Sequence, residues 1–151
     1  MTANEIAGNG KLIVDSRIND DFEGFDDEML FALSNGQYWI QAEYKYWYHY
    51  SYMPPVKIYS YKGSYYIFVD GQIQTVKVLQ IKDVTEATII NDFNGWSGET
   101  LFELDNGQIW KQAEYAYRYQ YSYRPKAIIY PVSRGYKIQV EGEAIGVRRL
   151  K

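Results

Sequence analysis

The composition of this 151-residue chain, with 46% hydrophobic and 23% charged residues, is that of a folded protein rather than a disordered one. Its 16 basic and 19 acidic residues give a net charge of −3, which argues against binding to duplex DNA, and the absence of cysteine excludes disulfides and thiolate metal sites. The N-terminus lacks a secretion signal and no stretch approaches the roughly 18 apolar residues of a membrane span, so we expect a soluble cytoplasmic protein without a membrane partner.

Short β-strands are predicted along the chain, and no segment shows the 3.6-residue period of a helix. After a loose N-terminal segment, the first strand is expected over residues 11–18. Asn35-Gly36 lies between two alternating apolar runs, which is a strong hairpin signal because both residues tolerate positive φ. Three further strands are expected over residues 56–61, 65–69 and 76–81, separated by turns at Lys62-Gly63 and Asp70-Gly71.

The second half of the sequence repeats the first. When Phe22 is placed on Phe93, an offset of 93 − 22 = 71, the match runs without a gap from positions 21/92 to 80/151, and 29 of those 60 positions are identical. We interpret this as an internal duplication with one domain over residues 11–81, a second over residues 87–151 and a polar linker between them. Because each copy is small, we expect the two to pack against each other.

The number of strands per copy, five or six, predicts an all-β fold made of two tandem small antiparallel SH3-like β-barrels, with an OB-like barrel or a roll as the alternative. Positions that stay apolar in both copies are expected to face inward: Phe31/Phe102, Leu33/Leu104, Tyr65/Tyr136, Ile67/Ile138 and Val69/Val140. Positions that turn polar in the second copy are expected to face outward: Ala32/Glu103, Ile40/Lys111, Tyr66/Lys137 and Phe68/Gln139.

Tyrosine is the most unusual component of the chain, with 17 copies. A first tyrosine ladder consists of Tyr44, Tyr46, Tyr48, Tyr50 and Tyr52, and a second tyrosine ladder of Tyr115, Tyr117, Tyr119, Tyr121 and Tyr123. A period of two in a strand places five rings on one face over about 27 Å. One interpretation is that two or three rings are core and the others cover the barrel mouth or the contact between copies. The other is an aromatic platform for a base, a sugar or a proline-rich peptide.

The ladder residues have the opposite parity from Trp39, which should face inward in the same strand. A β-bulge near Ala42-Glu43, and another near Ala113-Glu114, would reconcile the two sets.

The other face of the ladder strand differs between the copies. The first copy has Ile40, Trp47, His49, Tyr66 and Phe68 where the second has Lys111, Arg118, Gln120, Lys137 and Gln139. If these side chains are exposed, the first copy carries an apolar patch of the kind that marks contact sites. In the second copy, Arg118 and Arg124 could meet phosphate while rings stack on bases, although solvated surface charge is the simpler interpretation.

Catalytic and metal-binding chemistry has little support in the sequence. The acidic loop at residues 20–28 lacks the spacing of an EF-hand, and the only histidine, His49, aligns with Gln120. Carboxylate pairs such as Glu43 with Glu28 are the remaining acid and base candidates, and we interpret the repeated Glu43/Glu114 and Glu28/Glu99 as polar anchors. We therefore expect no enzyme, no metal and no cofactor.

One motif resembles that of a known group of proteins: Asp-Phe-x-Gly-[Phe/Trp], then Leu-Phe-x-Leu-x-Asn-Gly-Gln-x-Trp-x-Gln-Ala-Glu-Tyr-x-Tyr-x-Tyr-x-Tyr-Ser-Tyr. It is similar to short uncharacterised bacterial proteins that carry one such unit, here duplicated in tandem. The resemblance implies a bacterial or phage origin and a small β-barrel, and no catalytic residue.

These observations predict a non-enzymatic binding or adaptor module that uses aromatic-rich surfaces for protein–protein interaction, with itself or with another protein. The candidate binding residues are Tyr46, Trp47, Tyr48, His49, Tyr50, Tyr66 and Phe68 in the first copy and Tyr117, Arg118, Tyr119, Tyr121 and Arg124 in the second. The alternative is a binder of nucleotides or other small ligands, which would use tyrosines and the basic residues of the second copy. A carboxylate-based enzyme is the weaker alternative.

Overall fold

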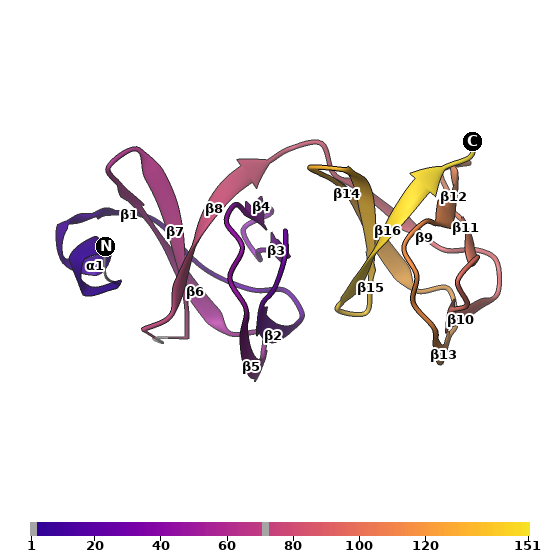
Figure 1. Cartoon of the computed structure of the whole chain (residues 1–151), viewed down its shortest axis with the longest axis horizontal. Helices are drawn as coiled ribbons and strands as arrows, with labels where there is room; N and C mark the ends of the chain where they lie inside the picture. Colours follow the sequence, from indigo (N-terminus) through magenta and orange to yellow (C-terminus); the bar gives the residue numbers. More distant parts are fainter. Residues whose placement is uncertain (1–2, 71–72) are drawn as a thin grey trace. The chain divides into compact units, whose positions relative to one another are not determined.

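The structure, a computed structural model, describes residues 3–70 and 73–151. It divides into two compact units, Met1–Lys82 and Asp83–Lys151, and apart from one short helix its regular elements are β-strands (Figure 1). The predicted all-β class is confirmed. The predicted turn at Asp70-Gly71 lies partly outside the described residues.

Among its described residues, the first unit contains one helix and eight strands. They are α1 (Ala3–Asn9), β1 (Lys11–Arg17), β2 (Asp21–Phe25), β3 (Leu30–Ala32), β4 (Tyr38–Gln41), β5 (Trp47–Tyr52), β6 (Pro55–Tyr61), β7 (Ser64–Val69) and β8 (Thr75–Ile81). The predicted hairpin at Asn35-Gly36 is confirmed, because this turn joins the antiparallel strands β3 and β4.

The second unit contains eight strands among its described residues. They are β9 (Thr85–Thr88), β10 (Phe93–Trp96), β11 (Leu101–Glu103), β12 (Ile109–Gln112), β13 (Arg118–Ser122), β14 (Lys126–Val132), β15 (Gly135–Val140) and β16 (Glu143–Arg149). The unit starts earlier than the sequence predicted, because Thr85 and Glu86 of the expected linker belong to β9 and pair with β14.

Each unit is built on an antiparallel six-stranded sheet that closes on itself. The order is β1-β6-β7-β8-β4-β3 in the first unit and, written in the same sense, β9-β14-β15-β16-β12-β11 in the second. The bridge Ile18↔Leu33 joins the end of β1 to the end of β3, and Ile89↔Leu104 does the same in the second unit. The sheet of each unit is therefore barrel-like.

The remaining two strands of each unit form a separate two-stranded ribbon. We call the pair β2–β5 the first ribbon and the pair β10–β13 the second ribbon (Figure 1). The inner face of the first ribbon supplies Phe22 and Phe25, both at most 1% exposed, to the core of the barrel. Phe93 and Trp96 are the corresponding residues of the second ribbon. The ribbon thus has a buried face and an outer face.

The cores contain most of the positions that were predicted to face inward. Phe31, Leu33, Ile67 and Val69 are each at most 1% exposed, and their counterparts in the second unit are buried as well. Tyr65 and Tyr136 are an exception, since they are 37% and 46% exposed. Their rings pack edge-on against Trp39 and Trp110 at the border of the core, with centroids 5.6 and 5.3 Å apart.

Three positions predicted to face solvent are covered. Tyr66 is 5% exposed and Ile40 is 8% exposed, while Phe68 is half-buried with its ring 5.4 Å from that of Tyr59. Tyr66 lies opposite Tyr59 on β6, and β6 is also the strand against which α1 packs. This outer side of the sheet is thus partly covered.

The N-terminal segment is not a loose end, because residues Ala3–Asn9 form a helix. Ile6 of this helix is 2% exposed, and the amide of Gly10 donates a hydrogen bond to the Ile6 carbonyl at 2.7 Å. One buried side chain in a seven-residue helix leaves too little periodicity for the sequence to reveal it.

The last strand does not follow the ungapped sequence match. Tyr65 pairs with Val78 in the first unit and Tyr136 with Val147 in the second, so the offset is 136 − 65 = 71 on one strand and 147 − 78 = 69 on the next. The turn Glu141-Gly142 is tight, with both residues at positive φ, and is two residues shorter than its counterpart. The shift keeps Val147 in the core, whereas the ungapped match would have placed exposed Arg149 at the position of Val78.

The pairing of the two strands in each ribbon shifts register at a β-bulge, and a glycine lies at this bulge: Gly24 in the first ribbon and Gly95 in the second. Gly24 has φ +109°, and a Cβ atom there would lie 1.7 Å from the carbonyl oxygen of Trp47. We expect Gly24→Ala to lower the free energy of unfolding of the first unit by more than about 2 kcal/mol, because it combines a strained φ with a backbone clash. Urea denaturation followed by tryptophan fluorescence measures this.

The matched control is Gly36→Ala. Gly36 also has a positive φ of +86°, but nothing lies within 4 Å of its Cβ position, so the strain of the left-handed backbone alone should cost about 1 kcal/mol. Equal losses for Gly24→Ala and Gly36→Ala would show that the strands of the ribbon are not in close contact at this point.

Candidate binding surface

The first tyrosine ladder begins where the chain leaves the barrel sheet. β4 ends at Gln41 and β5 begins at Trp47, so residues 42–46 belong to no strand. The predicted bulge near Ala42-Glu43 is therefore wrong, since the strand breaks completely. Tyr44 and Tyr46 lie in this break, while Tyr48, Tyr50 and Tyr52 lie in β5.

The amide of Gln41, which is 2% exposed, stabilises the break. Its oxygen accepts a hydrogen bond from the backbone N–H of Asp26 at 3.1 Å. Its nitrogen donates to the carbonyls of Asp26, of Glu43 at 3.0 Å and of Lys45 at 3.1 Å. Because buried backbone groups must be paired, this amide replaces the ladder bonds that the chain gives up when it leaves the sheet.

Gln112, 3% exposed, does the same in the second unit. Its oxygen accepts from the backbone N–H of Gly98 at 3.0 Å, and its nitrogen donates to the carbonyls of Glu114 and Ala116 at 3.0 and 2.9 Å. The same amide therefore performs the same task at the break near Ala113-Glu114.

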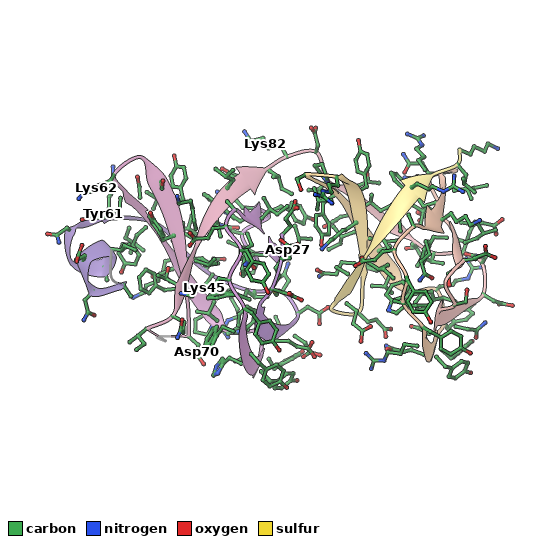
Figure 2. The ribbon with its side chains drawn as sticks, in the orientation of Figure 1. Asp27, Lys45, Tyr61, Lys62, Asp70 and Lys82 are labelled. Atoms are coloured by element: carbon green, nitrogen blue, oxygen red, sulfur yellow. The ribbon has the colours of Figure 1, made fainter. Side chains whose placement is uncertain are left out.

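Carboxylates attach the departing chain to the last strand of the barrel. The Glu43 side chain accepts from the backbone N–H of Lys77 at 3.0 Å, and Glu114 accepts from that of Gly146 at 2.7 Å. In the first unit the side chain of Lys45, labelled in Figure 2, also donates to the carbonyl of Thr75 at 2.7 Å. These bonds agree with the predicted role of Glu43 and Glu114 as polar anchors.

All ten rings of the two tyrosine ladders are exposed, by 55% for Tyr50 up to 90% for Tyr115. The expectation that two or three of them belong to a core is wrong. The reason is that half-buried and exposed side chains alternate along β5. Trp47, His49 and Ser51 are half-buried, and the tyrosines between them are exposed. The phenyl rings of β2 and the indole of Trp47 already fill the inner face of the ribbon, so Tyr48, Tyr50 and Tyr52 take the outer face.

Trp47 belongs to the core of the first unit. Its ring lies 5.0 Å from that of Phe25 and 6.2 Å from that of Phe22, and it stacks on His49 at 4.9 Å with an interplanar angle of 4°. Together with buried Tyr66 and Ile40 and half-buried Phe68, this placement means that the first unit does not expose the apolar patch that the sequence allowed.

The second unit holds its ribbon with polar contacts at the same place. Arg118 forms an ion pair with Glu143, whose other oxygen accepts from Nε1 of Trp96 at 3.0 Å. Arg118 is therefore engaged within its own unit.

Two further side chains of β13 are held by one carboxylate. The Gln120 amide and the Ser122 hydroxyl donate to the two oxygens of Glu141 at 2.6 and 2.5 Å. The copies therefore attach the same ribbon by different chemistry, aromatic in the first and polar in the second.

The outer face of the first ribbon is acidic as well as aromatic. Asp21 pairs with Tyr52 across the ribbon and accepts a hydrogen bond from the Tyr50 hydroxyl at 3.1 Å, and Glu23 is also exposed. This hydrogen bond and the negative charge of Asp21 raise the pKa of the Tyr50 phenol.

In the second ribbon, Asn94 replaces Glu23, and the guanidinium of Arg124 lies 5.7 Å from the ring centroid of Tyr123. Met53 stands at the position of Arg124 in the first unit. The two tyrosine ladders thus share their rings but differ in the charge around them.

Among residues 3–70 and 73–151, no group of three or more His, Asp or Glu side chains is placed to hold a metal ion. No helix in this part of the chain is long and apolar enough to cross a membrane.

Comparisons with known proteins do not assign the chain to a family. No family model matches it, and no curated protein or solved structure is similar to it. The resemblance to short bacterial proteins therefore stays a prediction from the motif, and the geometry of the tyrosine ladders is the basis for assigning a function.

The buried amide provides a stability test. We expect Gln41→Leu to lower the free energy of unfolding by about 2–4 kcal/mol, because it leaves several buried backbone groups without their partner. Gln112→Leu should have a similar effect in the second unit, whereas Gln80→Leu, at an exposed position on β8, should change it by less than about 0.5 kcal/mol. Urea denaturation is the measurement. A Gln41→Leu protein as stable as Gln80→Leu would contradict the role given to this amide.

The contact of Tyr50 with Asp21 gives a pH-dependent signal. The phenol of Tyr50 should lose its proton at lower pH in Asp21→Asn than in the unchanged protein, because the substitution removes the carboxylate that raises its pKa. Because the pKa is raised in the folded state, the contact stabilises the fold below pH 10 and this stabilisation is lost as the pH rises through the folded-state pKa. NMR titration with ring-labelled tyrosine measures both proteins. Identical titration of Tyr50 in the two would contradict the contact.

Proposed function

We propose that the protein is a non-enzymatic binding module in which each unit is an SH3-like barrel, the two having arisen by internal duplication, and in which the tyrosine ladders bind a protein partner. The closed antiparallel sheet of short strands and the shared strand order support this assignment of the fold. The identical residues of the repeat support the duplication.

The observation that carries the function is the exposure of all ten ladder rings, on the outer faces of the ribbons and on the segments that flank the ribbon strands. Tyrosine is enriched at protein interfaces, because its ring supplies a large contact area at low cost in conformational entropy and its hydroxyl tolerates water in the free state. The ribbons are anchored from their inner faces, so the rings are presented by an ordered backbone. Such preorganisation reduces the entropy lost on binding.

A nucleotide-binding function is less well supported. Arg118, one of the basic residues expected to meet phosphate, is already paired with Glu143. In the first unit the exposed residues of β2 beside the ladder, Asp21 and Glu23, are carboxylates, which repel phosphate. The observation that favours this second candidate is Arg124 beside the Tyr123 ring in the second unit. A carboxylate-based enzyme is weaker still, since the oxygen of Glu43 is engaged by the backbone of β8.

Selection from a random peptide library tests the proposed function. We expect the protein to enrich peptides that no longer bind a variant in which Tyr46, Tyr48 and Tyr50 are replaced by threonine, or the matched variant with Tyr117, Tyr119 and Tyr121 replaced. Threonine preserves the preference for β-structure, and the rings are exposed, so the melting temperature should change little. The affected affinities should fall by at least about tenfold, as is typical when central aromatic contacts are removed.

Trp47 is unsuitable for this test, because its replacement would disturb the core. If no ladder-dependent peptide is enriched and the protein sediments as a monomer at all concentrations, the proposed function is wrong. Thermal stabilisation by a nucleotide that is lost in Arg124→Ala would instead favour the second candidate.

A further inference from the structure

We infer that the first tyrosine ladder binds an extended peptide segment with arginine at alternate positions. This inference rests on the proposed function and adds the chemistry of the partner. It follows from the charge of the first ribbon, from the spacing of its rings and from a contact that the second unit makes within itself.

The charge of the first ribbon selects a cation. Asp21 and Glu23 are exposed on β2, and the pairing of Asp21 with Tyr52 places this carboxylate on the same face as the ladder. Residues 1–80 contain 6 basic and 10 acidic residues, a balance of 6 − 10 = −4. A guanidinium fits such a surface best, because it stacks on aromatic rings and binds carboxylates through paired N–H donors.

The spacing of the rings selects an extended backbone. Tyr48, Tyr50 and Tyr52 alternate along β5, so neighbouring rings are attached about 6.6 Å apart. Alternate side chains of an extended peptide have the same spacing, and each would meet one ring. A polyproline II segment repeats every three residues, or about 9.3 Å, and does not match.

The second unit contains an example of the contact within its own chain. The guanidinium of Arg124 lies over the ring of Tyr123, the last ring of the second tyrosine ladder. The corresponding residue after Tyr52 is Met53, so this residue supplies no cation to the first ladder. A guanidinium of the partner would take the equivalent place.

The same charges argue against a second copy of the chain as the occupant of this face. Two first ladders brought together would place the carboxylates of Asp21 and Glu23 of one copy near those of the other, and such like-charge contacts disfavour association. In the second unit Asn94 removes one of these carboxylates and Arg124 already covers one ring. The preference for arginine should therefore belong to the first ladder.

The test uses synthetic peptides and the full chain. A peptide of about nine residues that alternates arginine with serine covers the ladder. The comparison peptides carry citrulline or glutamate in place of arginine, or the same composition with the arginines placed consecutively. Isothermal titration calorimetry should show that the alternating arginine peptide binds at least about tenfold more tightly than each of them, and less tightly as salt is added.

Variants locate the site. The double variant Asp21→Asn with Glu23→Gln should weaken binding of the alternating arginine peptide by about tenfold, whereas the matched variant Asp92→Asn in the second unit should change it by less than about twofold. Tyr48→Thr combined with Tyr50→Thr should abolish it. An Asp92→Asn effect as large as that of the double variant would overturn the assignment to the first ladder.

The remaining outcomes are also decisive. Equal binding of the citrulline or glutamate peptide overturns the selection of a cation, and equal binding of the consecutive peptide overturns the match of spacing. If the alternating peptide does not bind while the random library yields ladder-dependent peptides of other composition, this inference fails and the proposed function stands. If the library also yields none, both fail.

Discussion

The buried side-chain amide of Gln41, and of Gln112 in the second unit, is the interaction on which the rest of each unit depends. An antiparallel strand that stops in the middle of a barrel leaves backbone donors and acceptors without partners. One glutamine, which binds the backbone of Asp26 and the carbonyls of Glu43 and Lys45 within the break, provides them. After the break the chain forms a new strand, β5, in the separate ribbon. The alternation of inward and outward side chains along β5 is therefore independent of that along β4. The tyrosines of the ladder are therefore exposed to solvent, while Trp39, a few residues earlier, lies in the core.

The inner faces of the two ribbons show that one backbone arrangement can be held by different chemistry. Phe25, Trp47 and His49 pack as rings in the first unit, whereas Trp96, Arg118 and Glu143 form an ion pair and a hydrogen bond in the second. In each unit the residues of this inner face contact one another, so the differences between the units affect how the ribbon is held on the barrel. The feature that both units keep without change, the outer row of tyrosines, is the one on which the proposed function rests.

Much of this arrangement was readable from the sequence, and the exceptions have physical reasons. The parity conflict between Trp39 and the tyrosines correctly placed an irregularity after Gln41, and most of the positions that were predicted to face inward lie in the cores. The complete break was not predictable, because it depends on Asp26, a residue of a distant loop that Gln41 meets only after folding. Two further features depend on which strands pair with each other: the burial of Tyr66 and the two-residue shift of the last strand. A sequence comparison of the two copies gives no information about this pairing.

If the ladders bind a partner as proposed, two ladders in one chain bind it more strongly than one. Each contact of a cation or another side chain with an exposed ring contributes about 0.5–1 kcal/mol, so one ladder of five rings supports only modest affinity. Linking two binding units makes the second contact intramolecular, and the overall affinity for a partner with repeated segments can exceed that of either unit by about two to four orders of magnitude. Because the rings are the same and the surrounding charges differ, each ladder can prefer a different segment of such a partner. Duplication followed by change of the neighbouring charges would therefore increase both affinity and selectivity while each barrel keeps its fold.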